Sequence, residues 1–165
     1  MSLHHDLIEQ AEHLANRELK KPRQASLRRA VSAAYYALFH MLTDDAVLKL
    51  IPNTPSLLRV QAQRAFTHGD MRNACEQFAK SSNTFARLLM RPVEPELQMV
   101  AEAFVELQIH RHAADYDLTQ IFDRIEVLGI IGQANSAILA WSSVRNTPNA
   151  NVFLAALLLN SRWNR

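Results

Sequence analysis

Apolar side chains recur every three or four residues along most of the chain, and this spacing predicts amphipathic α-helices. The longest such stretch is residues 23–50, where the apolar positions alternate between spacings of four and three: Leu27, Val31, Ala34, Leu38 and Leu42. Further helices are predicted over residues 2–19, 55–67, 71–80, 96–118 and 147–161. One more helix is expected to begin after Asp117 or Thr119 and to end near Arg145. Residues 81–95 lack the periodicity and are expected to pack on the core as an irregular connection.

These elements predict one all-α domain over residues 1–165, an antiparallel helical bundle with additional helices at its C-terminal end. The chain holds only 3 glycines and 6 prolines, too few for the tight turns of closely spaced strands. The last helix is apolar around most of its circumference, because residues 152–159 contain no polar side chain. Such a helix is either buried on several sides or part of a dimer interface.

Composition narrows the cellular setting. The single cysteine, Cys75, excludes an intramolecular disulfide and is expected to be a buried thiol. The N-terminal residues lack the layout of a signal peptide, and the longest apolar run, residues 152–159, is far shorter than a membrane span. We therefore expect a soluble, cytoplasmic protein that makes no contact with membranes and needs no cofactor.

The formal net charge of +2, from 18 basic and 16 acidic side chains, is too balanced for nonspecific binding of nucleic acid over the whole surface. A binding site for RNA would therefore have to be local. The best candidate is a run of five cations within ten residues: Lys20, Lys21, Arg23, Arg28 and Arg29. The alternative is a solvated entry to the second helix, which is a common setting for charge runs.

The fifth predicted helix carries the most informative polar side chains. Arg111 occupies a position of the core-facing stripe where an apolar residue is expected, so its permanent charge needs partners. Asp115, one turn later on the same face, is the nearest partner. On the adjoining arc, His112 and Tyr116 are expected to point toward packed protein, whereas His110 falls on the wetter side.

The second predicted helix offers a polar stripe that could either face this cluster or face water: Arg29, Ser32, Tyr36, His40 and Thr43. For Arg111 and Asp115 themselves, a purely structural ion pair is an alternative to a functional site. No metal site is expected, because His110 diverges from His112 and Asp115 by more than a right angle around the helix.

Two segments carry a pattern of a known family: RAVSAAYYALFH at residues 29–40 and RHAADYD at residues 111–117. They resemble the tyrosine-tyrosine-alanine, phenylalanine-histidine helix and the arginine, alanine-aspartate-tyrosine helix of the HEPN (higher eukaryote and prokaryote nucleotide-binding) superfamily. Their order and spacing match, and the resemblance covers residues 2–117 and, more loosely, the rest. It implies an all-α bundle that often dimerises and acts on or near RNA, frequently in toxin, antiphage or stress systems.

Catalytic members that this chain resembles carry an arginine followed by four to six residues and a histidine, and this pair cleaves RNA across a dimer interface. No arginine of the chain stands at that distance before a histidine, since Arg64 and His68 are one residue too close. We therefore expect a noncatalytic or cryptically active domain that binds RNA, a nucleotide or a protein partner such as an antitoxin. The candidate polar site consists of Tyr36, His40, Arg111, His112, Asp115 and Tyr116.

Two other functions stay open at this point. The first is a metal-independent ribonuclease of a toxin or stress-response system, in which Arg111 stabilises charge and His112 or His40 is the base. The second is a structural scaffold whose polar cluster only fixes the register of the helices. A homodimer is expected in the binding and ribonuclease functions, with an interface at the apolar last helix or around Tyr36 and His40.

Overall fold

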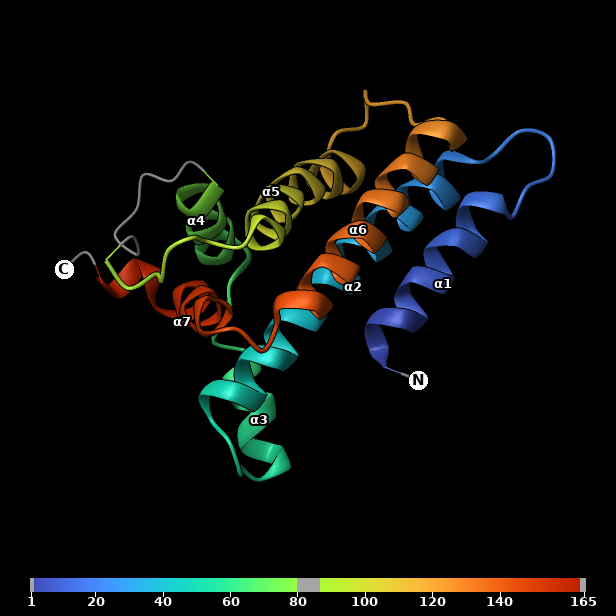
Figure 1. Cartoon of the computed structure of the whole chain (residues 1–165). Helices are drawn as coiled ribbons and strands as arrows, with labels where there is room; N and C mark the ends of the chain where they lie inside the picture. Colours follow the sequence, from blue (N-terminus) through green and yellow to red (C-terminus); the bar gives the residue numbers. More distant parts are fainter. Residues whose placement is uncertain (1, 80–86, 164–165) are drawn as a thin grey trace.

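The computed structural model describes residues 2–79 and 87–163, and every regular element within these ranges is a helix (Figure 1). The helices are α1 (Leu3–Asn16), α2 (Gln24–Leu50), α3 (Ser56–Gln63), α4 (His68–Ala79), α5 (Pro95–Tyr116), α6 (Arg124–Val144) and α7 (Pro148–Trp163). The prediction of an all-α bundle is confirmed. Much of the irregular connection expected between α4 and α5 falls on residues 80–86, outside the described residues.

The long helix α2 is the centre of the bundle, because α1, α5, α6 and α7 all pack against it. Its apolar positions supply much of the core: Leu27, Leu38 and Leu42 are completely buried. A helix of this kind is stabilised mainly by the apolar surface that its neighbours cover. The predicted core-facing seam of α2 is therefore confirmed.

The helices around α2 do not all run antiparallel to it. α1 and α5 are antiparallel to α2, as predicted, whereas α6 runs parallel to it (Figure 1). The two ends of this parallel pair are fixed by hydrogen bonds: Gln24 is bonded to the backbone of Phe122 at one end, and Trp141 donates to Asp45 at the other. The prediction of an antiparallel bundle is therefore wrong for this pair. α2 and α6 are each antiparallel to α5, so they run parallel to each other.

The start of α4 differs from the prediction, which placed the cap at Asp70. The helix begins at His68, and Thr67 caps it: the backbone amide of Asp70 donates to the Thr67 hydroxyl oxygen at 3.1 Å, and this hydroxyl donates to the Asp70 carboxylate at 2.9 Å. The earlier start adds one turn to α4 and places His68 inside the fold.

The start of α6 also differs from the prediction. Asp123 caps this helix by accepting a hydrogen bond of 2.8 Å from the amide of Glu126. Asp117, one of the two predicted starting points, instead forms a turn in which its carboxylate accepts from the amide of Thr119 at 2.9 Å. The connection between α5 and α6 is therefore longer than expected.

The last helix, α7, uses most of its apolar circumference within the chain. It packs against α2 and α4, and Phe153, Leu154 and Leu157 are completely buried. The predicted burial on several sides is confirmed, as is the burial of Cys75, which raises the pKa of its thiol. This packing leaves α7 little apolar surface for a second chain, and the homodimer stays a prediction.

One described helix, α6, is long and apolar enough to pass a length and hydropathy test for a membrane span. Half of that stretch is buried against the rest of the protein. α6 packs on α1, α2 and α5, as a core helix of a bundle does.

Arg28 holds the C-terminal end of α5 against α2. Its guanidinium donates to the carbonyl oxygens of Ala114 at 2.9 Å and Asp117 at 3.0 Å, and it also reaches the carbonyls of Ala113 and Gln120. The last carbonyls of a helix have no partners within the helix and carry partial negative charge, so a guanidinium satisfies them well.

We expect Arg28→Ala to lower the free energy of unfolding by about 2 kcal/mol, because it leaves several part-buried carbonyl groups without a donor. The matched control is Arg29→Ala, next in the chain, whose exposed side chain makes no hydrogen bond or ion pair with any described residue. This control is expected to change stability by less than about 0.5 kcal/mol. Urea denaturation followed by circular dichroism measures both, and equal losses would contradict the role given to Arg28.

Candidate functional site

The centre of the candidate site is a polar network between α5 and α2. Nη2 of Arg111 donates to the hydroxyl oxygen of Tyr36 at 2.9 Å, and Nε of Arg111 lies 2.8 Å from a carboxylate oxygen of Asp115. The hydroxyl of Ser32 donates to the other Asp115 oxygen at 2.6 Å. The predicted pairing of Arg111 with Asp115 and with the α2 stripe is therefore confirmed.

Arg111 is also enclosed by aromatic rings. Its Cζ lies 5.9, 5.5 and 5.7 Å from the ring centroids of Tyr35, Tyr36 and Tyr116. The Nε–H group is poorly aligned with Asp115, so that contact is an ion pair more than a linear hydrogen bond. With its side chain only 14% exposed, Arg111 is held by one carboxylate, one hydroxyl and three ring faces.

A histidine that the sequence did not indicate joins this cluster. Nδ1 of His68, at the start of α4, lies 2.7 Å from the hydroxyl oxygen of the buried Tyr35, and its ring is 4.5 Å from that of Phe39. Burial lowers the pKa of His68, and the positive charge of Arg111 lowers it further. His68 is therefore neutral at pH 7 and forms part of the aromatic packing beside Arg111.

His40 lies one turn beyond Tyr36 on α2. The two rings are stacked, with centroids 6.0 Å apart. Partial burial lowers the pKa of His40, and Asp44 opposes this effect with its negative charge. His40 is thus a neutral imidazole beside the network, but it has no contact of its own with Arg111.

Three of the predicted positions on α5 are wrong. His112 is exposed, and Tyr116, whose ring lies 4.9 Å from that of His112, is 63% exposed. His110 is half-buried instead of being on the wetter side. The reason is the position of α6, which covers the side of α5 that carries His110; a hydrogen bond from Gln133 to Glu106 marks this contact.

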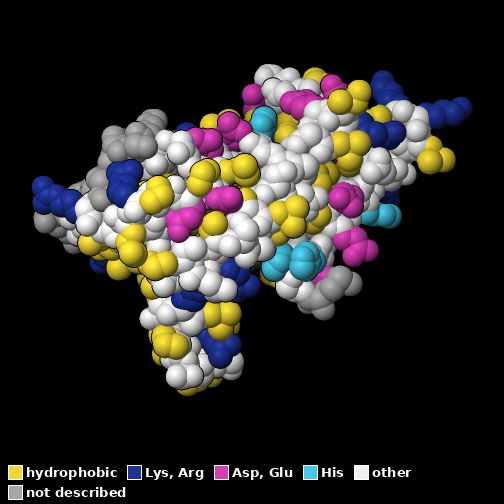
Figure 2. All heavy atoms as spheres, in the orientation of Figure 1, with side chains coloured by type: hydrophobic (Ala, Val, Ile, Leu, Met, Phe, Trp, Pro, Cys, Tyr) yellow, Lys and Arg dark blue, Asp and Glu magenta, His cyan; other side chains and the backbone are white. Residues whose placement is uncertain are grey.

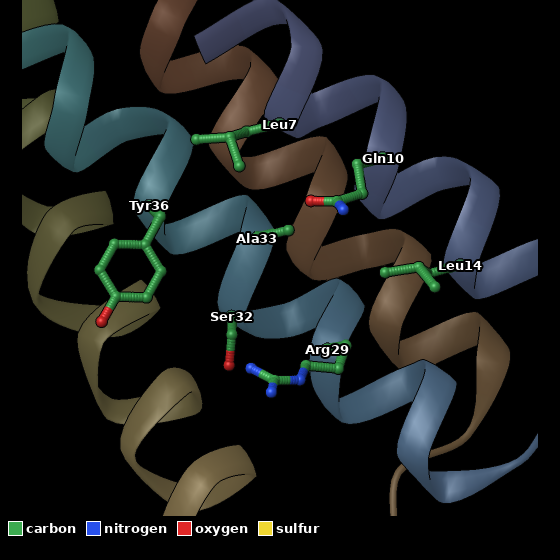
Figure 3. Close-up of a pocket in the computed structure, with 7 residues that line it drawn as sticks. All are labelled: Leu7, Gln10, Leu14, Arg29, Ser32, Ala33 and Tyr36. Carbon is green, nitrogen blue, oxygen red and sulfur yellow. The ribbon is translucent and has the colours of Figure 1, made fainter. Parts of the chain in front are cut away.

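The predicted α2 stripe lies between α1 and α5, and three of its residues, Arg29, Ser32 and Tyr36, form the floor of a groove there. Of its members, Ser32 and Thr43 are buried, Tyr36 and His40 are half-buried, and Arg29 alone is exposed. The alternative that the stripe simply faces water is therefore wrong for all of it except Arg29. Figure 3 shows the ring of Tyr36 directed toward α5 and the side chains of α1 along the opposite side.

Two hollows open onto this floor, and Arg29 lines both. The first, named here the apolar hollow, has a volume of about 360 Å³ and lies between α1 and α2, with Leu7, Leu14 and Tyr36 in its walls (Figure 3). The second, named here the polar hollow, has a volume of about 470 Å³ and lies between α2 and the end of α5, beside Asp115 and Tyr116. Together they join the candidate residues of α2 and α5 to a solvent-accessible surface.

The basic run seen in the sequence lies at the same end of the molecule. Lys and Arg side chains gather around the connection between α1 and α2 (Figure 2). Lys20, Lys21, Arg23 and Arg29 are exposed, and their side chains form no hydrogen bond or ion pair with any described residue. Arg28, the fifth member, is instead engaged with the end of α5.

No group of three or more metal-ligating side chains forms among residues 2–79 and 87–163. Comparisons with protein-family models, with curated proteins and with solved structures found no match. The geometry of the groove therefore carries the functional argument.

We expect Arg111→Ala to destabilise the protein by about 2 kcal/mol, because it leaves a mostly covered carboxylate and a tyrosine hydroxyl without their partner. The Asp115 side chain is 25% exposed, which keeps the loss below that of a fully buried pair. The double variant Arg111→Ala, Asp115→Ala is expected to lose less than the sum of the single variants.

The matched control is the ion pair of Arg72 and Glu76 on α4, which has the same spacing and the same 2.8 Å distance but side chains 40% and 33% exposed. Arg72→Ala is expected to cost less than about 0.5 kcal/mol. Chemical denaturation measures the free energy of unfolding of both series of variants. Similar losses for Arg111→Ala and Arg72→Ala would show that enclosing the ion pair does not make it more stabilising.

Proposed function

We propose that this chain is a HEPN-like helical domain that binds the phosphate of RNA or of a nucleotide in the groove over α2, without cleaving it. The observation that carries this proposal is Arg29, an exposed cation that lines both hollows and makes no hydrogen bond or ion pair with any described residue. Phosphate oxygens are preferred ligands of a guanidinium, which can bind them through two parallel hydrogen bonds.

The charges around Arg29 support an anionic ligand. The charge of Arg111 is balanced by Asp115, and Arg28 faces the partial negative charge at the end of α5. Arg23 is partly balanced by Glu18, whose pKa it helps to lower, whereas Arg29 and the exposed Lys20 and Lys21 are left without such compensation. A local positive potential thus arises at one end of a protein whose net charge is only +2.

The exposed ring of Tyr116 supports a nucleic acid over a simple anion. It lines the polar hollow beside Arg29, and Tyr116 is 63% exposed, with the Arg111 guanidinium on one face of the ring. Proteins that bind single-stranded RNA commonly combine cations along the backbone with exposed aromatic rings on which bases stack. The resemblance to the HEPN superfamily points in the same direction.

The test is the binding of a fluorescently labelled single-stranded RNA, measured by anisotropy at two or more salt concentrations. Arg29→Ala is expected to weaken binding about tenfold, because it removes a charge-assisted contact to phosphate. The slope of the logarithm of the affinity against the logarithm of the salt concentration is expected to fall by about one, because one fewer phosphate is neutralised. The variant is suited to this test because Arg29 supports no other described residue.

The matched control is Arg59→Ala, since Arg59 is an equally exposed arginine on α3, away from the groove. Its affinity for RNA is expected to equal that of the unmodified protein. If the two variants bind equally well, or if RNA does not bind at all, the proposed function is wrong.

A ribonuclease is the second candidate, and the neutral imidazole of His40 beside Tyr36 favours it, because a neutral histidine can accept the proton of a 2′-hydroxyl. Against it, Arg111 is already engaged by Asp115 and Tyr36, and it makes no contact with His40. The cation and the base needed at one phosphate are thus not brought together within one chain.

We therefore expect the purified protein to cleave RNA, in the presence of a chelator, no faster than its His40→Ala variant. Gel analysis of a labelled RNA over several hours measures this, with both proteins prepared identically. Cleavage that is clearly faster with the unmodified protein would favour the ribonuclease.

A further inference from the structure

The two hollows share one cation, and this arrangement is more specific than a basic surface. Arg29 stands between them: the apolar hollow lies on its α1 side and the polar hollow on its α5 side. Their volumes of about 360 and 470 Å³ fall at the lower end of the range for small-molecule sites. We propose that each hollow holds one of two successive bases of single-stranded RNA, and that the phosphate linking these two unstacked nucleotides lies at Arg29. This inference rests on the proposed function.

The apolar hollow has the properties of a site for a flat, mostly apolar ring. Leu7 and Leu14 of α1 line it together with Ala33 and Tyr36 of α2, so a base there would meet mostly hydrocarbon and aromatic surface (Figure 3). The amide of Gln10 also lines the hollow and can both donate and accept a hydrogen bond at the edge of a base. The combination of apolar walls and a few polar groups is typical of such sites.

The polar hollow offers a stacking surface instead of an enclosure. Tyr116 is exposed and the Arg111 guanidinium covers one face of its ring, so the other face is the stacking surface, while the Asp115 carboxylate beside it is already occupied by Arg111 and Ser32. Arg28 is held by the carbonyl groups at the end of α5 and does not compete for the ligand. A second base would therefore lie on Tyr116, with Arg29 as the cation nearest its phosphate.

The distance between the hollows selects the kind of RNA. Ala25, Arg28 and Arg29 of α2 line the polar hollow, and Arg29, Ser32, Ala33 and Tyr36 line the apolar hollow, so the mean positions of the two sets differ by about five residues. At a rise of 1.5 Å per residue this is roughly 8 Å along the helix axis. Stacked bases are about 3.4 Å apart, so a duplex cannot place neighbouring bases in both hollows, whereas an unstacked single strand can.

The test measures how adenosine monophosphate, the dinucleotide ApA, a single-stranded hexanucleotide and an RNA hairpin displace a labelled single-stranded RNA. The dinucleotide is expected to bind at least tenfold more tightly than the mononucleotide and within a few-fold of the hexanucleotide, because it fills both hollows. The hairpin is expected to bind at least tenfold more weakly than the hexanucleotide.

Two variants test the hollows separately. Gln10→Phe, which fills the apolar hollow from the exposed surface of α1, and Tyr116→Ala, which removes the stacking ring, are each expected to reduce the affinity for ApA about tenfold. Tyr116→Phe keeps the ring and Gln61→Phe adds the same ring to exposed residue 61 of α3, so both are expected to bind ApA normally.

The outcomes separate this inference from the proposed function. Equal affinity for the mononucleotide and ApA, equal affinity for hairpin and single strand, or no effect of Gln10→Phe and Tyr116→Ala would overturn the two-base site. Single-stranded RNA would in each of these cases still bind through Arg29. Loss of all RNA binding, or an Arg29→Ala variant that binds normally, would instead overturn the proposed function itself.

Discussion

The fold around the groove depends on the enclosure of one charge that cannot be neutralised. Arg111 lies on the side of α5 that faces α2, and a guanidinium stays protonated at any pH at which a protein is folded. α2 therefore has to place groups opposite Arg111 that accept hydrogen bonds or attract a cation. Tyr36 accepts a hydrogen bond from Arg111 directly, and Ser32 donates one to Asp115, the carboxylate that pairs with Arg111. These contacts fix how far α5 can slide or rotate on α2.

Three arginines of this region, Arg28, Arg29 and Arg111, have different roles because their surroundings differ. Arg111 is enclosed and paired, so it positions helices and holds Tyr36 in place. Arg28 satisfies the last carbonyls of α5 and sets where that helix ends. Arg29, one residue later, is rotated by about 100° around α2 and is exposed, although it lines the polar hollow together with Arg28. Only this last arginine is free to bind something else.

The sequence predicted the elements built on strong periodicity and missed those that depend on tertiary contacts. The seam of α2 and the pairing of Arg111 with Asp115 follow from spacing within single helices, which sequence shows directly. His68 could not be found in this way, because its contacts with Tyr35 and Phe39 come from another helix. A Thr-x-x-Asp cap at its start was the available signal, and it was assigned to the wrong residue.

The exposure of His112 and Tyr116 has the same kind of cause. Their arc of α5 also carries Val105 and Ile109, which suggested a packed side, yet Ile109 is 47% exposed in the fold. Apolar side chains at helical spacing indicate burial only where another element is available to cover them, and α5 has three such neighbours, α2, α4 and α6, on its other sides. Tyr116 is left uncovered for this reason, at the point where α5 ends beside Arg29.

The groove itself follows from how α2 is covered. α6 packs on α1, α2 and α5 together and so closes one long side of the central helix. On the opposite side α1 and α5 each contact α2, and no described helix bridges them as α6 does. The strip of α2 between them carries Arg29, Ser32, Tyr36 and His40, and of these residues Arg29 is the exposed one. A site placed on this strip is supported by the helix on which α1, α5, α6 and α7 all pack, and it still reaches solvent at Arg29. Its side chains are therefore positioned before a flexible single strand binds, which lowers the cost of ordering that strand.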